Sequence, residues 1–328
     1  MSPPAHDYVT VVRTEADVAI HAQVIAATPK SILCNYEYSS PLEIIQFDAE
    51  FHDAGIPLRR WIVGDHANPE GVAVCFRPTW RISSYTFWVQ VRLMPGASPS
   101  AERALWESIQ RWARSAGARA LQTMAHPGDQ TPLPTMLACT RIGTEQIYVK
   151  YAPLCPVELP PRPSGITFHT LAELLDRDSD AIERACTLHA AISHEVPLPD
   201  EPVVTLAKFR RLIGEYVDPQ HYVVGVIDGQ YVAESILHVE DDGVTVWQHA
   251  TGVVPAYRGL GIGQHVKYAA LEIAARIPAR EVRTWVESHN ASMLHINTRF
   301  GFQPRVDESA ISHIYEISIV NNGGDGNR

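Results

Sequence analysis

The most informative stretch of the chain reads Val253-Val-Pro-Ala-Tyr-Arg258-Gly259-Leu-Gly261-Ile-Gly263. It joins a run of strand-forming residues to an apolar pattern with helical spacing. Backbone N–H groups at the start of a helix have no partner within the helix, and the helix dipole favours an anion there. Glycines at alternating positions let the main chain approach a ligand closely, because no Cβ blocks the way. Arg258 adds a guanidinium that suits phosphate oxygens, so the stretch predicts a phosphate-binding loop.

Two widespread nucleotide-binding motifs do not fit this loop. The dinucleotide motif GxGxxG has a different spacing from Gly259-x-Gly261-x-Gly263. The mononucleotide motif needs Lys followed by Ser or Thr after the glycines, and that pair is missing. A flexible strand–helix connection that binds nothing remains the structural alternative.

The residues around the loop predict a mixed α/β sheet. Ile262, Val266, Ala270, Ile273 and Ile277 recur at helical spacing, and Pro278 ends that helix. Before the loop we expect a strand, two helices and an antiparallel meander: 165–171, 180–193, 205–216, 222–227, 231–239 and 244–251. After the helix we expect a strand, a second helix and a final strand: 282–286, 290–299 and 311–319. Helices on both faces of such a sheet give an α/β class with mostly antiparallel strands.

The pattern Pro-x-x-Arg258-Gly259-x-Gly261-Ile262-Gly263 resembles the acetyl-CoA pyrophosphate loop of the GNAT superfamily of N-acetyltransferases. The strand before the loop fits this family, as do Asn290 at the start of the next helix and Phe300-Gly301-Phe302. The resemblance covers about 165–319 strongly and the first half weakly. The whole chain looks like the tandem two-domain GNAT proteins, a group that includes mycothiol synthase.

This resemblance implies acetyl-CoA as co-substrate. The backbone of Val253 and Val254 would pair with the pantetheine arm and polarise the thioester carbonyl, and the N–H groups from Gly259 to Gln264 would hold the pyrophosphate. The implied cofactor-binding residues are Val253, Val254, Arg258, Gly259, Leu260, Gly261, Ile262, Gly263, Gln264, Asn290 and Asn297. Family members often carry a Tyr at the position of Asn297 to protonate the leaving thiolate. Asn can hydrogen-bond the sulfur but cannot act as an acid at neutral pH, so the source of that proton stays open.

A proline-rich segment divides the chain near its midpoint. It contains five prolines in 153–163, which cannot form a helix or a central strand. We therefore expect a degenerate GNAT-like domain over 1–152, a stiff linker over 153–164, a catalytic GNAT domain over 165–320 and a disordered tail over 321–328.

The two halves contain a faint repeat. Thr140-Arg-Ile-Gly143 matches Thr298-Arg-Phe-Gly301, and Pro95 corresponds to Pro255, each followed by a helical pattern. The first half has Ser98-Pro-Ser-Ala-Glu-Arg103 where the glycine-rich loop would lie. This segment has no glycine, its proline lacks an N–H, and its glutamate would repel a diphosphate. We expect one active site, in the second half.

The candidate acid–base residues lie in the meander. Two hairpin registers are possible, and under both Glu234, Ile236 and His238 share a face with Trp247, His249 and Thr251. Glu234 lies directly opposite His249 in one register and diagonally in the other. We predict Glu234 as the base, directly or through water, with His249 second. A buried Glu–His ion pair or an exposed sheet edge is an equally good explanation.

Metal binding is not indicated. His189 and His194 lie five residues apart, whereas zinc-binding helices use a spacing of four. The five cysteines form no CxxC pair, so we expect neither a disulfide framework nor a zinc–thiolate site.

Composition narrows the partners and the compartment. The 328 residues suit two domains, and 27 Lys plus Arg against 37 Asp plus Glu give a net charge of −10. That balance argues against nucleic acid as partner. No run approaches the ~20 apolar residues of a membrane span, and the N-terminal stretch lacks a signal-peptide pattern. We therefore expect a cytoplasmic protein that binds no membrane; its oligomeric state stays open.

The predicted activity is acetyl transfer from acetyl-CoA to the primary amine of a small molecule, directly, in a ternary complex. Two alternatives remain. One is a regulatory protein that binds CoA without catalysis, which the missing Tyr permits. The other is a tRNA-dependent aminoacyl transferase, against which the negative charge argues.

Overall fold

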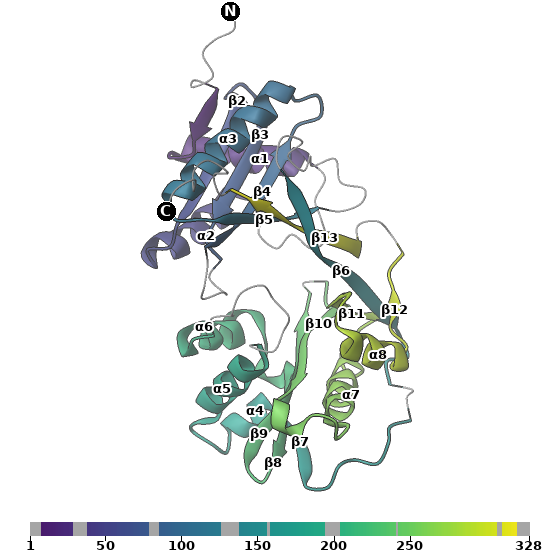
Figure 1. The fold of residues 1–328 in the computed structure, drawn as a ribbon. Coiled ribbons are helices and arrows are strands. Elements are labelled where there is room, and N and C mark those ends of the chain that lie inside the picture. The colour runs from purple at the N-terminus through teal and green to yellow at the C-terminus, as the bar shows by residue number, and fades with distance from the viewer. Residues whose placement is uncertain are drawn as a thin grey trace, which may run out of the picture. The chain divides into compact units, whose positions relative to one another are not determined.

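A computed structural model describes residues 8–28, 38–78, 85–125, 138–155, 158–193, 204–240, 242–306 and 310–319. The chain forms two compact units, whose elements are labelled in Figure 1 and coloured there by residue number. The first unit comprises Met1–Glu145 and Asp307–Arg328, and the second comprises Gln146–Val306.

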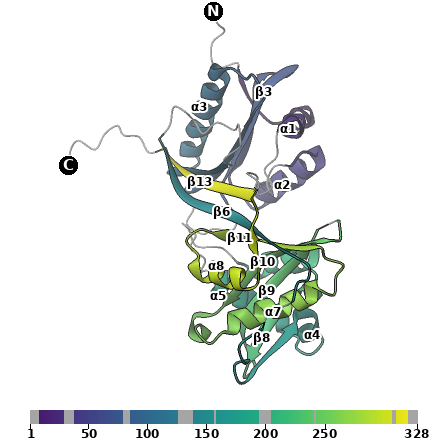
Figure 2. The ribbon, with the colours of Figure 1, turned by 90° about the vertical axis from the view of Figure 1, so that its right-hand side faces the viewer.

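The first unit is a sheet with helices on both faces. Its elements are β1 (Val9–Val11), α1 (Glu15–Ala27), α2 (Pro41–Asp53), β2 (Leu58–Asp65), β3 (Asn68–Phe76), β4 (Thr86–Leu93), α3 (Pro99–Ser115), β5 (Ala120–Ala125) and β13 (Ile311–Ser318). The strand order is β1-β2-β3-β4-β5-β13, and all pairs are antiparallel except β4 with β5. Helix α3 covers one face, and α1 and α2 cover the other (Figure 2).

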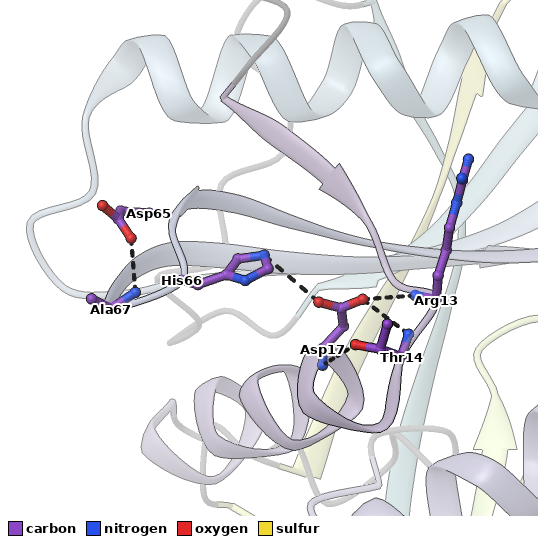
Figure 3. Close-up of polar contacts among 6 residues, drawn as sticks. All are labelled: Arg13, Thr14, Asp17, Asp65, His66 and Ala67. Atoms are coloured by element: carbon purple, nitrogen blue, oxygen red, sulfur yellow. Dashed lines mark hydrogen bonds and ion pairs between the residues drawn. The ribbon is translucent and has the colours of Figure 1, made fainter.

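The start of α1 fixes the chain where it leaves β1. Thr14 caps the helix, and its side chain accepts a hydrogen bond from the Asp17 N–H. The Asp17 carboxylate accepts in return from the N–H groups of Arg13 and Thr14, both at 3.0 Å (Figure 3). This reciprocal arrangement satisfies N–H groups that the helix itself leaves without partners. The backbone of Arg13 is thereby held in place.

The second unit repeats this plan. Its elements are β7 (Ile166–Thr170), α4 (Leu171–Leu175), α5 (Ala181–Ser193), α6 (Leu206–Arg211) with a π-helical turn (Leu212–Tyr216), β8 (Tyr222–Ile227), β9 (Gln230–Val239), β10 (Thr245–Val253), α7 (Ile262–Ala274), β11 (Glu281–Glu287), α8 (Ala291–Arg299) and β12 (Gln303–Pro304). The strands run in the order β7-β8-β9-β10-β11, antiparallel except for β10 with β11. The predicted repeat and the mixed α/β class are therefore confirmed.

Two apolar cores lie on opposite faces of the second sheet. One packs α7 against the sheet and contains Ile262, Val266 and Phe300. The other packs α5 and α6 against it and contains Leu188 and Phe209. Figure 1 shows α5 and α6 on one side of β8–β10 and α7 on the other. The sheet is thus covered on both faces, as its nearly continuous apolar strands require.

The packing boundaries differ from those expected along the sequence. The final strand, expected to close the domain 165–320, is β13 and pairs with β5 of the first unit. Conversely, β6 (Cys139–Tyr151), expected within 1–152, enters the second unit at Gln146 and pairs there with β12. Each half of the sequence thus supplies the last strand of the other unit's sheet. A local apolar pattern specifies a strand but does not say which edge it joins.

The structure describes part of the predicted linker and leaves several other predicted positions undescribed. Of the linker 153–164, Leu154 is buried in the second unit's core, and Cys155 and Leu159 pack against that core. Parts of some predictions lie outside the described residues: 156–157 of the linker, Asp241 of the hairpin turn, His194, Cys34 and the tail 321–328.

Candidate active site

Strand β10 changes its pairing halfway along. Near the hairpin Trp247 lies opposite His238, and after an irregularity between Gln248 and Ala250 the register moves by one residue. The parallel pairing with β11 extends only from Thr245 to Trp247. From Gln248 onward β10 therefore pairs, among the described residues, only with β9, which leaves a gap in the pairing between β10 and β11.

The main chain at the end of β10 offers one donor to this gap. The Val254 N–H donates to the Val232 carbonyl of β9 at 3.0 Å. Because successive residues of a strand direct their N–H groups to opposite sides, the Val253 N–H points away from β9. Of the two residues predicted to hold the pantetheine arm, Val253 thus presents its N–H and Val254 has already used its own.

The glycine-rich loop leaves the N-terminus of α7 open. Gly259 and Gly261 have φ of +78° and +79°, a conformation that side chains rarely adopt. No heavy atom lies within 4 Å of the position a Cβ would take on either glycine. Gly261 is the N-cap of α7, and no side chain caps the helix. The first N–H groups of α7 are therefore available to an anion.

The other predicted loop residues have distinct positions. Leu260 is exposed, whereas Ile262 is buried and anchors α7 in the core. Arg258 donates from Nε to the Val253 carbonyl at 3.0 Å, so its side chain folds back over the end of β10. The Gln264 N–H donates to the Gly261 carbonyl at 3.2 Å, which removes it from the available donors.

Helix α8 meets this loop. A Cβ on Gly263 would lie 3.6 Å from Val253 and 3.7 Å from Ile296, so α7, β10 and α8 converge there. Asn290 caps α8 by accepting a hydrogen bond from Met293 N–H at 3.1 Å. Asn297, next to Ile296, is 0% exposed, and neither its Nδ2 nor its Oδ1 has a hydrogen-bond partner among the described residues. Buried amides are normally paired, so this one is available to a partner that the described residues do not supply.

Glu234 forms a buried polar triad with two residues that sequence reasoning did not connect to it. It is 0% exposed, and its carboxylate accepts a hydrogen bond from the Tyr222 hydroxyl and contacts His189 Nδ1 at 2.9 Å. Burial lowers the pKa of His189, but the charge and hydrogen bond of Glu234 outweigh burial and raise it. Burial and the Glu234 charge raise the pKa of Tyr222 well above its usual value, so Tyr222 stays a neutral donor.

This triad lies beside the end of β10. Glu234 is directly opposite Gly252. A Cβ on Gly252 would lie 2.2 Å from a methyl group of Ile192, one turn after His189 on α5, so α5 packs directly on this glycine. The His189 side chain is 19% exposed and is the member of the triad that reaches solvent. The spacing between His189 and His194 did not indicate a metal site. Nothing else in the sequence indicated that His189 would contact Glu234.

The predicted opposition of Glu234 and His249 is wrong. The register shift places Glu234 opposite Gly252 and moves Thr251 to the other face, where its hydroxyl lies 2.9 Å from Ser235. His249 occupies the irregularity itself, with its ring centre 4.8 Å from that of Trp285. Desolvation first, and then the nearby His238, lowers the pKa of His249, which favours its neutral ring. A bulge inserts one residue and reverses the faces beyond it.

A buried lysine lies on the opposite face of the sheet. Lys267 on α7 is 1% exposed and donates a hydrogen bond to the Gln248 side chain. Its Nζ also lies 4.5 Å from the centre of the Phe302 ring. Desolvation lowers the pKa of Lys267 to about 7. Nothing in the sequence distinguishes this residue, because a lysine in an amphipathic helix usually lies at the surface.

The equivalent helix of the first unit has a closed N-terminus. Ser98 caps α3 by accepting from the Ala101 N–H at 3.2 Å. The carboxylate of Glu70 accepts a hydrogen bond from the Ser98 N–H at 2.7 Å, so an anion of the protein already lies at this helix end. The two units therefore differ at the position where α7 is open.

The described residues contain no group of three or more His, Cys, Asp or Glu side chains placed to bind a metal ion. None of their helices combines the length and apolar character needed to span a bilayer.

Comparisons with known proteins show one family match and several structures with a similar fold. Residues 186–302 match the acetyltransferase (GNAT) family, while no curated protein matches the chain. A GCN5-related N-acetyltransferase from Sphaerobacter thermophilus is 18% identical over 98% of both chains, with a TM-score of 0.63. A tandem GNAT protein from the clavulanic acid biosynthesis pathway is 17% identical over 96% of this chain and 99% of its own, with a TM-score of 0.65.

A third similar structure is a glucosamine N-acetyltransferase region of a fungal multi-domain β-N-acetylglucosaminidase. It is 12% identical over 94% of this chain and 38% of its own, with a TM-score of 0.62. At these identities the likenesses show a shared fold, which includes the tandem arrangement.

Proposed function

We propose that this acyltransferase, whose residues 186–302 match the GNAT family, transfers an acetyl group from acetyl-CoA to a small-molecule primary amine. The observation that carries the proposal is the uncapped N-terminus of α7, where Gly259 and Gly261 leave open space beside the free end of β10. Transfer is direct, in a ternary complex. The net charge of −10 supports a small cationic acceptor over nucleic acid, and composition supports a cytoplasmic location.

Acetyl-CoA fits the residues around this helix end. The N–H groups from Gly259 to Gly263 would hold its pyrophosphate, and the Val253 N–H would serve the pantetheine arm or the acyl oxygen. The buried amide of Asn297 has unpaired donor and acceptor atoms, which suit a polar group or sulfur entering the gap. Bound there, acetyl-CoA would supply the activated acyl group. No metal takes part in the proposal.

His189 and Glu234 form the proposed acid–base pair. Because Glu234 is 0% exposed, the more exposed His189 takes the proton from an incoming ammonium, and the Glu234 carboxylate stabilises the imidazolium that forms. The Glu234 contact at His189 Nδ1 fixes the ring and leaves Nε2 to accept the proton. This arrangement keeps Glu234 as the negative group predicted from sequence and adds His189 as the residue that meets the amine. His249, neutral and outside the triad, becomes a contact for the acceptor rather than its base.

The first unit serves a supporting role in this proposal. Its α3 N-terminus is capped by Ser98 and lies next to the Glu70 carboxylate, which supports a single acetyl-CoA site per chain. Because the fold resembles that of a glucosamine N-acetyltransferase region, amino sugars are one of the acceptor classes to test.

Release of free CoA from acetyl-CoA in the presence of a panel of primary amines tests the function. The panel comprises amino sugars, aminoglycosides and amino acid amides. We expect amine-dependent release that falls by at least about 100-fold in Glu234→Gln and in His189→Ala, the usual range for loss of an acid–base group. Tight acetyl-CoA binding without release for any amine would support a regulatory protein instead.

A further inference from the structure

A groove in the first unit gathers three arginines around apolar walls. Its volume is about 670 Å³, and it is lined by Arg13, Arg59 and Arg60 with Trp112 and Leu58 among the apolar residues. Small-molecule sites have volumes of about 300–1,000 Å³, with mostly apolar linings and a few convergent polar groups. All lining residues belong to the first unit. The groove is therefore distinct from the glycine-rich loop of the second unit.

Two of these arginines carry charges that no carboxylate neutralises among the described residues. The backbone of Arg13 is bound to Asp17, but its guanidinium extends away from that carboxylate (Figure 3). The guanidinium carbon of Arg59 lies 5.3 Å from the centre of the Trp112 ring. Partial burial and the charge of Arg13 lower the pKa of Arg59. The two like charges are thus close enough to repel each other, an arrangement that an anion would relieve.

The third arginine is buried and incompletely paired. Arg60 is 3% exposed, and its Nε donates to both carboxylate oxygens of Asp48, at 2.9 and 3.0 Å. Its Nη2 has no hydrogen-bond partner in the part of the chain that the structure describes. Asp48 neutralises one of the three arginine charges, so the groove keeps two positive charges in a chain whose net charge is −10.

Trp112 forms the aromatic wall of the groove and packs against other aromatic rings. Trp112 packs edge-to-face on Trp61 and Phe87, with ring centres 5.4 and 5.9 Å apart. Arg59 lies over this indole, which orients its guanidinium. The groove therefore places the guanidinium of Arg59 next to the apolar surface of Trp112.

We propose that this groove binds a small organic dianion. Arg13 and Arg59 hold a dianionic head group, either a phosphate monoester or a pair of carboxylates, and the apolar part of the ligand lies against Leu58 and Trp112. Guanidinium groups pair with both kinds of head group through two parallel N–H donors. Two uncompensated positive charges match two negative charges on the ligand.

Isothermal titration of the full chain with phenyl phosphate tests this site, with phthalate as the dicarboxylate probe. We expect binding of one phenyl phosphate or one phthalate per chain, and the tighter of the two identifies the head group. Arg13→Ala and Arg59→Ala should each weaken binding at least about tenfold, as expected for loss of a charge-assisted hydrogen bond. Both side chains are exposed, so circular dichroism should show an unchanged fold.

Two control variants separate this site from other anion sites. Arg103→Ala removes an exposed charge of α3 outside the groove and should leave the affinity unchanged. Gly261→Asp blocks the loop of the second unit and should also leave it unchanged. Absence of binding by both probes at millimolar concentration, or wild-type affinity in both arginine variants, would overturn the proposal. Equal affinity for inorganic phosphate and phenyl phosphate would overturn the role of the apolar wall.

Discussion

The Lys267 amine donates a hydrogen bond to the side chain of Gln248, the last residue of β10 before its register shifts. Gln248 donates in turn to the Ser235 hydroxyl at 2.9 Å, and Ser235 lies 2.9 Å from the Thr251 hydroxyl beyond the shift. Hydrogen bonds thus link Gln248, before the irregularity, and Thr251, after it, to Ser235 of β9. These hydrogen bonds stabilise the shifted register of β10, beyond the point where its pairing with β11 ends.

Lys267 should make the stability of the protein depend on pH near neutrality. Its pKa is about 7 when folded against an ordinary 10.5. Between these values the unfolded chain holds a proton that the folded chain has lost, so stability rises with pH. The free energy of unfolding of the wild type, minus that of Lys267→Met, should rise by up to about 1.4 kcal/mol per pH unit above pH 7. Urea unfolding at several pH values measures this; a constant difference would contradict it.

Glu234→Gln should lower the pKa of His189. In the wild type the Glu234 carboxylate raises that pKa above the ordinary 6.5 despite burial. With a neutral amide in its place, burial acts unopposed and favours the uncharged ring. NMR titration of the His189 ring protons should give a value above 6.5 in the wild type and below it in the variant. Glu240→Gln, directly after the end of β9, is the matched control and should leave this titration unchanged. A His189 pKa that does not move would refute the pairing.

Asn297→Leu should separate ligand binding from stability. Both polar atoms of this buried amide lack partners among the described residues, so an apolar side chain of similar size removes an unfavourable term. Without ligand, the variant should be as stable as the wild type or about 1 kcal/mol more stable. Its affinity for acetyl-CoA should fall. Thermal unfolding with and without acetyl-CoA measures both effects.

Asn290→Ala provides the contrast to that variant. Asn290 lies on the same helix, but its side chain is used as the cap of α8. Its loss should lower stability by about 1 kcal/mol. If Asn297→Leu destabilised the ligand-free protein as much as Asn290→Ala does, the Asn297 amide would have a partner within the protein. It would then not be available to bind a ligand.

The glycine-rich loop and the antiparallel meander before it could be predicted from sequence because their signals are local. Gly259 and Gly261 adopt the left-handed conformation that only glycine takes easily. The turn at Asp228-Gly229 likewise has positive φ at both residues, as a two-residue hairpin requires. Here residue type and backbone conformation are directly linked.

The buried cluster of Glu234, His189 and Tyr222 could not be predicted, because it depends on non-local geometry. A single extra residue at His249 reversed the faces of β10 and replaced an expected Glu234–His249 contact with Glu234–His189. The alternation of residues cannot reveal where a bulge occurs when polar residues line both faces of a strand. Similarly, nothing local indicated that the strand Ile311–Ser318 would join the first unit's sheet.

Titration of the full chain with acetyl-CoA, compared between Gly261→Asp and Gly229→Asp, tests the central claim most directly. Both glycines have positive φ, +79° and +76°, and open space at the Cβ position, but only Gly261 caps α7. The account predicts one acetyl-CoA bound per wild-type chain, the same for Gly229→Asp, and none for Gly261→Asp. Two bound per chain, or binding that survives in Gly261→Asp, would contradict it.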